Sequence, residues 1–275
     1  MSEDEFVVML VAIGGSILAA VKTRVSSLPP ALSSQNPGIG LMRLAVAASL
    51  FWAAVVIRYF GDESIRGIYV VFYMIMAYAV IKFFGQIMGP SLFGLHLRSD
   101  VYERKNLAAA VFIAALILAT GLLFGGSLWG EADPTGDDEG GWWIPLSFFL
   151  LGWAVLTAAT ALYLWREPGR FRTQIRQERD TAMAWSAAVY IVTTASLIFE
   201  GVAGDFWGWR HGLLGMGTIG VMLVGHEAFI AVAGSGEGPG RVSVARRVFE
   251  RLFYVGLAGG AWGLNRLIDT HFGGG

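Results

Sequence analysis

Ionisable side chains interrupt several long apolar stretches of this 275-residue chain, and they are the first candidates for chemistry. A charged side chain inside a membrane costs about 2.5–3.5 kcal/mol on insertion scales, so each one needs a reason. Lys82 and Glu227 lie at similar depth in two apolar segments, where an ion pair would neutralise both. Glu200 and Arg266 form a second depth-matched pair near the opposite surface. Alternatively, the basic side chains extend to the interface and the carboxylates face water inside the bundle.

His226 adjoins Glu227 and raises the question of a redox cofactor. Haem with two axial histidines needs a second histidine at matching depth, whereas His96, the candidate on that side, lies between predicted helices. The absence of cysteine excludes disulfides, thiolate-held clusters and a catalytic cysteine. The chain also lacks a Walker-type loop, a nucleotide fingerprint and a nucleophile elbow. We therefore expect no catalytic residue, no metal and no cofactor, and interpret His226 as a hydrogen-bonded histidine of a helix bundle.

The composition places these residues in a membrane protein. Hydrophobic residues make up 55% of the chain and charged residues 15%, whereas soluble domains carry about 25% charged residues. The chain contains 10 Trp, 18 Phe and 37 Gly, which suit interfacial anchors and close helix packing. The N-terminal MSEDEF is acidic, whereas a signal peptide begins with basic residues, so we expect the first apolar segment to be retained.

Eight apolar segments are long enough to cross a membrane, since about 20 helical residues span the hydrocarbon core. We predict an all-α, polytopic transmembrane bundle in one integral-membrane domain, residues 1–275. The predicted spans are Phe6–Val25, Leu41–Phe60, Gly67–Met88, Leu107–Trp129, Trp142–Trp165, Thr181–Ala203, Gly212–Ala233 and Phe249–Ile268. Prolines and glycines, such as Met88-Gly89-Pro90, mark the predicted connections.

The distribution of basic residues predicts the orientation. Of the 20 Lys and Arg residues, 15 lie in or beside the connections that follow the first, third, fifth and seventh spans. The positive-inside rule assigns these connections to the cytoplasm and both termini to the outer side. The acidic segment Glu131–Glu139 then faces outward. We expect a multi-pass protein of the bacterial inner membrane, in contact with the bilayer and not with nucleic acid.

Two stretches of the chain repeat one another. Residues Glu103–Gly126 and Glu178–Gly201, 75 positions apart, share six identities in 24 positions, including Glu103/Glu178 and Arg104/Arg179. Asn106 stands directly before the first apolar run and is suited to cap its helix, and Thr181 holds the equivalent position in the second copy. We interpret the pattern as a duplicated helical hairpin, residues 69–130 and 142–205, flanked by helical hairpins at 1–66 and 206–275.

The repeated phrase, with Asn106-Leu107-Ala108-Ala109-Ala110 followed by Gly121, Gly125 and Gly126, resembles the YjfL-like "domain of unknown function 350" family of bacterial inner-membrane proteins. The resemblance covers roughly residues 69–205, and the second copy departs from it with Thr181-Ala182-Met183-Ala184. The family has no established activity. Its members resemble components found alongside phage-shock-type, membrane-remodelling proteins, which implies a role in membrane integrity and a cytoplasmic membrane-remodelling partner.

The basic segment Arg170–Asp180 is typical of an amphipathic helix, because Phe171 and Ile175 lie four residues apart on one face. The surrounding arginines are candidates for contact with anionic lipid headgroups or with a partner. These arginines are Arg170, Arg172, Arg176 and Arg179. The alternative is that they only enforce the topology.

Pairs of glycines four residues apart predict faces on which helices approach closely. Gly121 and Gly125 form one such face, and Gly256 and Gly260 form another, where a contact with a further subunit or a second copy is expected.

Three classes of function fit these observations. The first is a non-enzymatic scaffold or subunit of a membrane complex, for which the family resemblance and the absence of catalytic motifs argue. The second is an ion or small-solute transporter built from repeated hairpins, with Lys82 and Glu227 in the pathway. The third is a redox subunit that binds haem or quinone through His226.

Overall fold

The structure, a computed structural model, describes residues 3–25, 36–131, 141–166 and 171–205, together with isolated positions between 213 and 259. Within that part of the chain, six helices are long and apolar enough to cross a membrane. They correspond to the first six predicted spans. The seventh and eighth predicted spans, Gly212–Ala233 and Phe249–Ile268, lie almost entirely outside the described residues. The protein is therefore an all-helical, membrane-embedded bundle across its described part.

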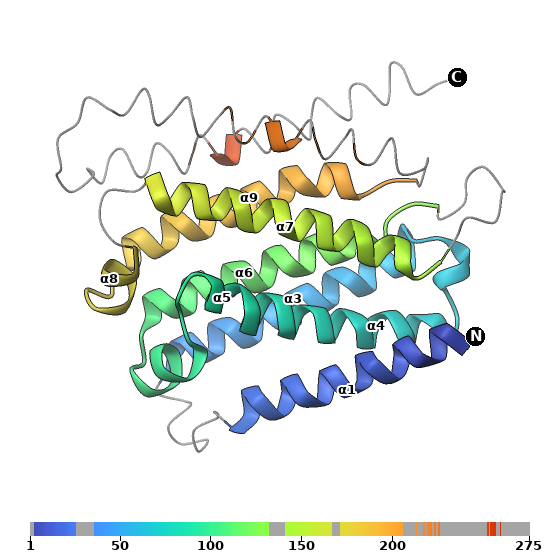
Figure 1. The fold of residues 1–275 in the computed structure, drawn as a ribbon, viewed down its shortest axis with the longest axis horizontal. Coiled ribbons are helices and arrows are strands. Elements are labelled where there is room, and N and C mark those ends of the chain that lie inside the picture. Colours follow the sequence, from blue (N-terminus) through green and yellow to red (C-terminus); the bar gives the residue numbers. More distant parts are fainter. Residues whose placement is uncertain are drawn as a thin grey trace.

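The long helices run side by side (Figure 1). They are α1 (Glu3–Val25), α3 (Pro37–Tyr59), α4 (Tyr69–Val80), which continues as the π-helix η2 (Ile81–Met88) and α5 (Gly89–Leu92), α6 (Leu107–Gly126), α7 (Trp143–Arg166) and α9 (Thr181–Val202). The short elements are the 3₁₀-helix η1 (Glu63–Ile65), the π-helix η3 (Leu97–Glu103) and α8 (Phe171–Arg176).

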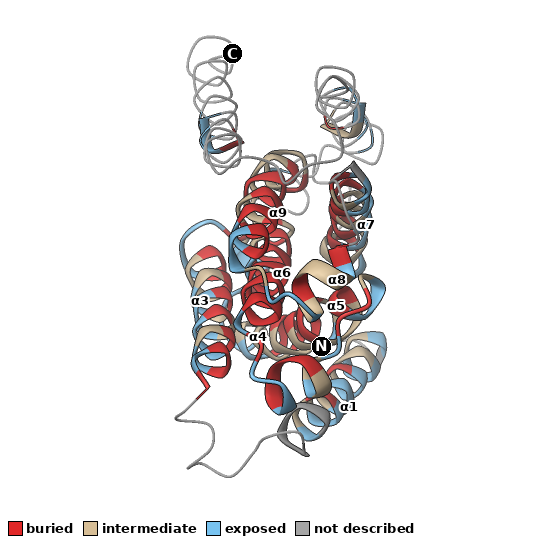
Figure 2. Cartoon of the chain, turned by 90° about the vertical axis from the view of Figure 1, so that its left-hand side faces the viewer, coloured by how far each residue is buried: buried red, intermediate tan, exposed pale blue. Residues whose placement is uncertain are grey.

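Helix α6 is the centre of the bundle, packed between α3 and α9 (Figure 2). In its membrane-length segment 83% of the residues are buried inside the protein, against 11% in α1 at the edge. The sequence of α6 suits this central position, because its many Ala and Gly residues let neighbouring helices approach closely. Helix α1 packs on α4, and α7 packs on α9.

Glycines set the distance between α6 and α3. A Cβ at Gly121 would overlap Ser49, and a Cβ at Gly125 would overlap the Trp52 indole, so both glycines face α3. The Ser49 hydroxyl donates to the carbonyl of Ile117 at 3.2 Å across the same interface. This is close packing of the kind that the spacing predicts. Of the second predicted pair, Gly260 lies outside the described residues.

A polar side chain caps each of the three described long helices that begin at the basic end of the bundle, the end that carries η3 and α8. The Asn36 side chain accepts from the Gly38 amide, and the Asn106 side chain accepts from the Ala109 amide. In α9 the cap is Asp180, whose carboxylate accepts from the amides of Ala182 and Met183. The prediction that Thr181 caps this helix is wrong, because Thr181 is the first residue of the helix and Asp180 is its cap.

The residues that precede the caps of α6 and α9 support the equivalence of Asn106 and Asp180. Lys105 and Arg179 have φ angles of 50° and 54°, a left-handed conformation that is uncommon for residues with a side chain. Asn106 and Asp180, like Lys105 and Arg179, are 74 positions apart. The structural equivalence of the two hairpins therefore runs over 74 positions rather than 75.

Successive hairpins are hydrogen-bonded to each other at both ends of the bundle. At the basic end, the side-chain amide of Asn36 donates to the carbonyl of Val101 at 2.8 Å. The side-chain amide of Asn106 donates to the carbonyl of Ile175 at 2.6 Å. At the opposite end, Gly130 N–H donates to the Phe60 carbonyl and Gly204 N–H to the Trp129 carbonyl, each at 3.0 Å. The first hairpin thus carries the same junction as the second, although its sequence falls outside the predicted repeat.

The predicted connection at Met88-Gly89-Pro90 is wrong, because the third span continues through it to Leu92. The π-helix η2 precedes this point without a break, and Pro90 lies in the α-helical turn α5 that follows it. The span therefore covers 24 residues, Tyr69–Leu92.

Candidate functional site

Asp100 is the buried charge around which the basic end is built. Its side chain has no exposed surface. One carboxylate oxygen accepts from the His96 backbone amide at 2.8 Å, and the other accepts from Arg176 Nε at 2.9 Å. The Arg104 guanidinium lies 3.9 Å from that second oxygen. Because an uncompensated buried charge is strongly unfavourable, these contacts hold η3 and α8 together.

The backbone between Asp100 and Asn106 connects this ion pair to the start of α6. Asn106 N–H donates to the Asp100 carbonyl at 3.1 Å, and the Asn106 side chain is 1% exposed. Its oxygen caps α6 while its amide donates to α8 through the Ile175 carbonyl. Asn106 therefore does more than cap a helix: it fixes α8 against η3.

The apolar face of α8 packs into the protein and not against lipid headgroups. Ile175 is fully buried, and the Phe171 ring lies 4.9 Å from the Phe112 ring of α6. The apolar face of the predicted amphipathic segment is thus covered by protein, whereas contact of its arginines with lipid headgroups or with a partner stays a prediction. The apolar side of α8 is covered by α6. Arg176 turns toward η3, and Arg172 extends to the loop at Gly94.

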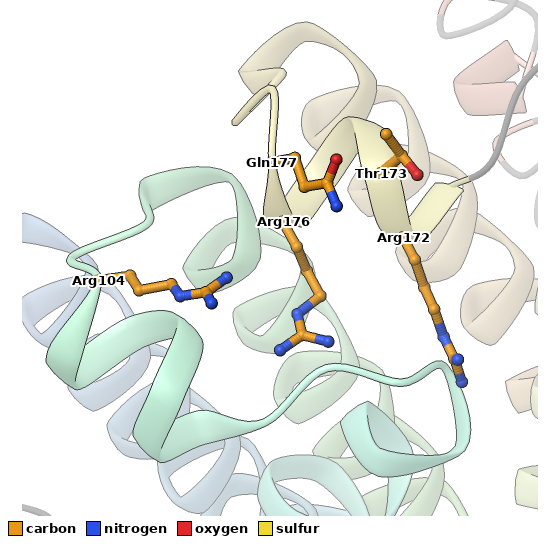
Figure 3. A pocket seen from close by; sticks show the side chains of 5 residues that line it. All are labelled: Arg104, Arg172, Thr173, Arg176 and Gln177. Atoms are coloured by element: carbon orange, nitrogen blue, oxygen red, sulfur yellow. The ribbon is translucent and has the colours of Figure 1, made fainter.

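These arginines line an open recess between η3 and α8 with a volume of about 280 Å³ (Figure 3). Arg104 reaches across from the end of η3 toward Arg176 on α8, and Arg172 stands one helical turn before Arg176. Thr173 and Gln177 complete the lining. Three guanidinium groups line the recess, and only those of Arg176 and Arg104 lie near the Asp100 carboxylate, so the recess keeps a surplus of positive charge. Guanidinium groups bind phosphate and carboxylate oxygens through paired hydrogen bonds, which makes the recess a candidate anion site.

Gly94 provides the space for Arg172. Its φ is +72°, a conformation that favours glycine, and any Cβ there would overlap the Arg172 guanidinium. Among the described residues, Arg172 forms neither a hydrogen bond nor an ion pair, so its donors are available to a ligand. The predicted headgroup residue Arg179 is exposed and does not line the recess, and Arg170 lies outside the described residues.

Asp100, which organises this site, was not among the candidates predicted from the sequence. Asp100 and Glu103 are the two acids in the basic connection after the third span, and an acid among these basic residues was the available signal. Of the repeat motif, Glu103 forms an exposed ion pair with Arg98 at 3.0 Å, and Glu178 is exposed. Arg104 is the member of that motif that the fold brings into the recess.

Lys82 lies in the π-helix η2, half-buried in the span. Its ammonium donates to Gln86 Oε1 at 2.8 Å and lies 5.7 Å from the centre of the Tyr78 ring. Gln86 is four residues further along and 4% exposed, and the sequence interpretation overlooked it. Glu200 is half-buried on α9.

The predicted partners of these two charges, Glu227 and Arg266, lie outside the described residues, as does His226. The two ion pairs and the redox role therefore stay predictions. Within the described ranges, no group of three or more acidic or histidine side chains is arranged to hold a metal ion. Comparison with family models, with curated proteins and with solved structures finds no match for this chain.

Proposed function

We propose that this chain is a non-enzymatic, multi-pass scaffold or subunit of a membrane complex, with its basic end in the cytoplasm. The observation that carries the proposal is the continuous junction between hairpins. Three successive hairpins are hydrogen-bonded at both ends around α6, a helix of which 83% of the residues are buried. Interlocked packing of this kind favours a rigid body over one that opens and closes.

The orientation of the bundle and its role in membrane integrity are supported by further observations. The recess gathers Arg104, Arg172 and Arg176 at one end of the bundle, which is the cytoplasmic end by the positive-inside rule. The resemblance to the YjfL-like family adds the bacterial inner membrane, a function in membrane integrity and a cytoplasmic partner. The rigid bundle would present the arginine recess to the cytoplasm as a fixed docking site.

A pull-down from native membranes in mild detergent tests this function. We expect other membrane or cytoplasmic proteins to co-purify at constant stoichiometry with the tagged chain, because a scaffold acts through stable contacts. The same membranes with the untagged chain are the control, and mass spectrometry identifies the partners. Recovery of the chain alone, or of a pure homo-oligomer, contradicts the scaffold.

A second function, transport of an ion or small solute, is favoured by one observation. The third span changes from α- to π-helix at Ile81, and this irregular segment carries the half-buried Lys82. π-Helical segments occur frequently at functional sites, and a charge at membrane depth is typical of an ion pathway.

Flux measurements on Lys82→Met decide between the two functions. If the chain is a scaffold, proteoliposomes with the wild type and with Lys82→Met leak protons and potassium at the same low rate as empty liposomes. Arg58→Met is the matched control for the loss of one basic residue, because Arg58 lies in the last turn of α3, away from the basic end of the bundle. Flux through the wild type that is abolished in Lys82→Met and kept in Arg58→Met would establish transport.

A further inference from the structure

We infer that the arginine recess and an adjoining apolar groove bind one anionic phospholipid of the cytoplasmic leaflet, with its phosphate in the recess and an acyl chain in the groove. The inference deepens the proposed function, because it rests on the proposed orientation of the basic end and names the ligand of the recess.

The groove lies directly beside the recess and shares two of its residues. Its volume is about 540 Å³, and it is formed by the end of α5, the end of α7 and the start of α8. Arg172 and Thr173 line both spaces. The remaining lining residues are apolar: Leu92, Phe93, Ala161, Leu164, Trp165 and Phe171. A charged recess that passes into an apolar groove matches the two halves of a phospholipid.

The groove also lies at the depth where these two halves meet in a bilayer. Leu92 is the last residue of the third span, and Trp165 is next to last in α7. Both are open to the surroundings, with 55% and 84% of their surface exposed. Tryptophan concentrates at the boundary between hydrocarbon and headgroups, so the groove opens into the acyl layer and the arginines stand at headgroup level.

Charge selects the headgroup. Asp100 engages Arg176 and leaves two guanidinium groups without a short ion pair, those of Arg104 and Arg172. Their five-donor forks suit a phosphate diester, and the Gln177 amide and Thr173 hydroxyl can donate further hydrogen bonds. A zwitterionic lipid would bring a cationic choline against the same arginines. The recess therefore favours a lipid with net negative charge.

Native mass spectrometry of the purified full chain with added phosphatidylglycerol or phosphatidylcholine tests the site. We expect the wild type to bind phosphatidylglycerol preferentially. The double variant Arg104→Gln/Arg172→Gln should bind it about thirtyfold more weakly, since each basic residue contributes about a factor of five. The control Arg98→Gln/Arg179→Gln removes two positive charges from the same end without touching the recess, and should stay within about twofold of the wild type.

The apolar half has its own test. Trp165→Ala should weaken phosphatidylglycerol binding about fivefold, because indole is lost from the groove wall, whereas Trp185→Ala on α9 should not. Thermal unfolding in detergent confirms that each variant is folded.

Two results would overturn the inference. One is equal binding of phosphatidylglycerol to the recess variant and to its control. The other is full competition by inorganic phosphate or by an acidic peptide together with no effect of Trp165→Ala, which would assign the recess to a soluble anion. These outcomes do not depend on whether proteins co-purify in the pull-down, so the lipid site and the scaffold can fail separately.

Discussion

Arg176→Met should lower the free energy of unfolding by about 2–3 kcal/mol, although the residue lies at the edge of the bundle. The substitution leaves the fully buried Asp100 carboxylate with the His96 amide and with Arg104 at 3.9 Å. Removal of one partner from a buried ion pair costs about 3–5 kcal/mol, and the 28% exposure of Arg176 places the expected loss below that range. Equilibrium unfolding in mixed micelles measures the change.

Two further variants separate the ion pair from a general loss of charge. Arg104→Met removes the second arginine from the same carboxylate, but this side chain is 51% exposed, so the expected loss is below about 1 kcal/mol. Asp100→Asn combined with Arg176→Met should be more stable than Arg176→Met alone, because the stranded charge is gone. Equal losses for Arg176→Met and Arg104→Met would show that Asp100 does not depend on its closest arginine.

The sequence predicted the helices well because length and hydropathy suffice for that purpose. The first six predicted spans coincide with the observed helices to within a few residues at most ends. The start of the second span, predicted at Leu41, lies at Pro37, and the end of the third, predicted at Met88, lies at Leu92, beyond Gly89-Pro90, which looks like a break. Only the structure shows that the helix continues through Gly89-Pro90, because η2 passes directly into α5.

The register of the repeat was one residue off because the 75-position alignment favours charged identities in a connection. The structure aligns the caps, the left-handed residues and the terminal glycines at 74 positions. Six identities then lie in α6 and α9, and a seventh, Gly130/Gly204, lies after them. The six are Ala108/Ala182, Ala110/Ala184, Ala114/Ala188, Ile117/Ile191, Thr120/Thr194 and Leu123/Leu197. Packing, and not charge, is what the two hairpins share.

The recess could be predicted only in part. Arg172 and Arg176 stood out because they follow one another on an amphipathic helix. Their meeting with Arg104 and Asp100 depends on a hydrogen bond between Asn106 and Ile175, 69 positions apart, and no local pattern encodes that distance. The amphipathic pattern itself indicates only that one face of α8 is buried. It does not tell whether lipid or protein covers that face.

Gly130→Ala should be the more damaging of two matched substitutions at the opposite end of the bundle. Gly130 joins three hairpins: its amide donates to Phe60, it forms a bridge with Gly61, and it packs on the backbone of Gly204. Its φ is +106°, and a Cβ would overlap the Gly204 carbonyl group. A backbone group cannot rotate away as a side chain can, so the junction must separate.

Gly204→Ala isolates the conformational part of this effect. Gly204 has a similar φ of +118°, but no described atom lies within 4 Å of its Cβ position. We expect Gly204→Ala to lose about 1–2 kcal/mol from backbone strain alone, and Gly130→Ala to lose at least about 2 kcal/mol more. Unfolding in mixed micelles compares the two variants directly. Equal losses would mean that the hairpins tolerate separation at this end, and the rigid junction on which the scaffold rests would then be confined to the caps at the basic end.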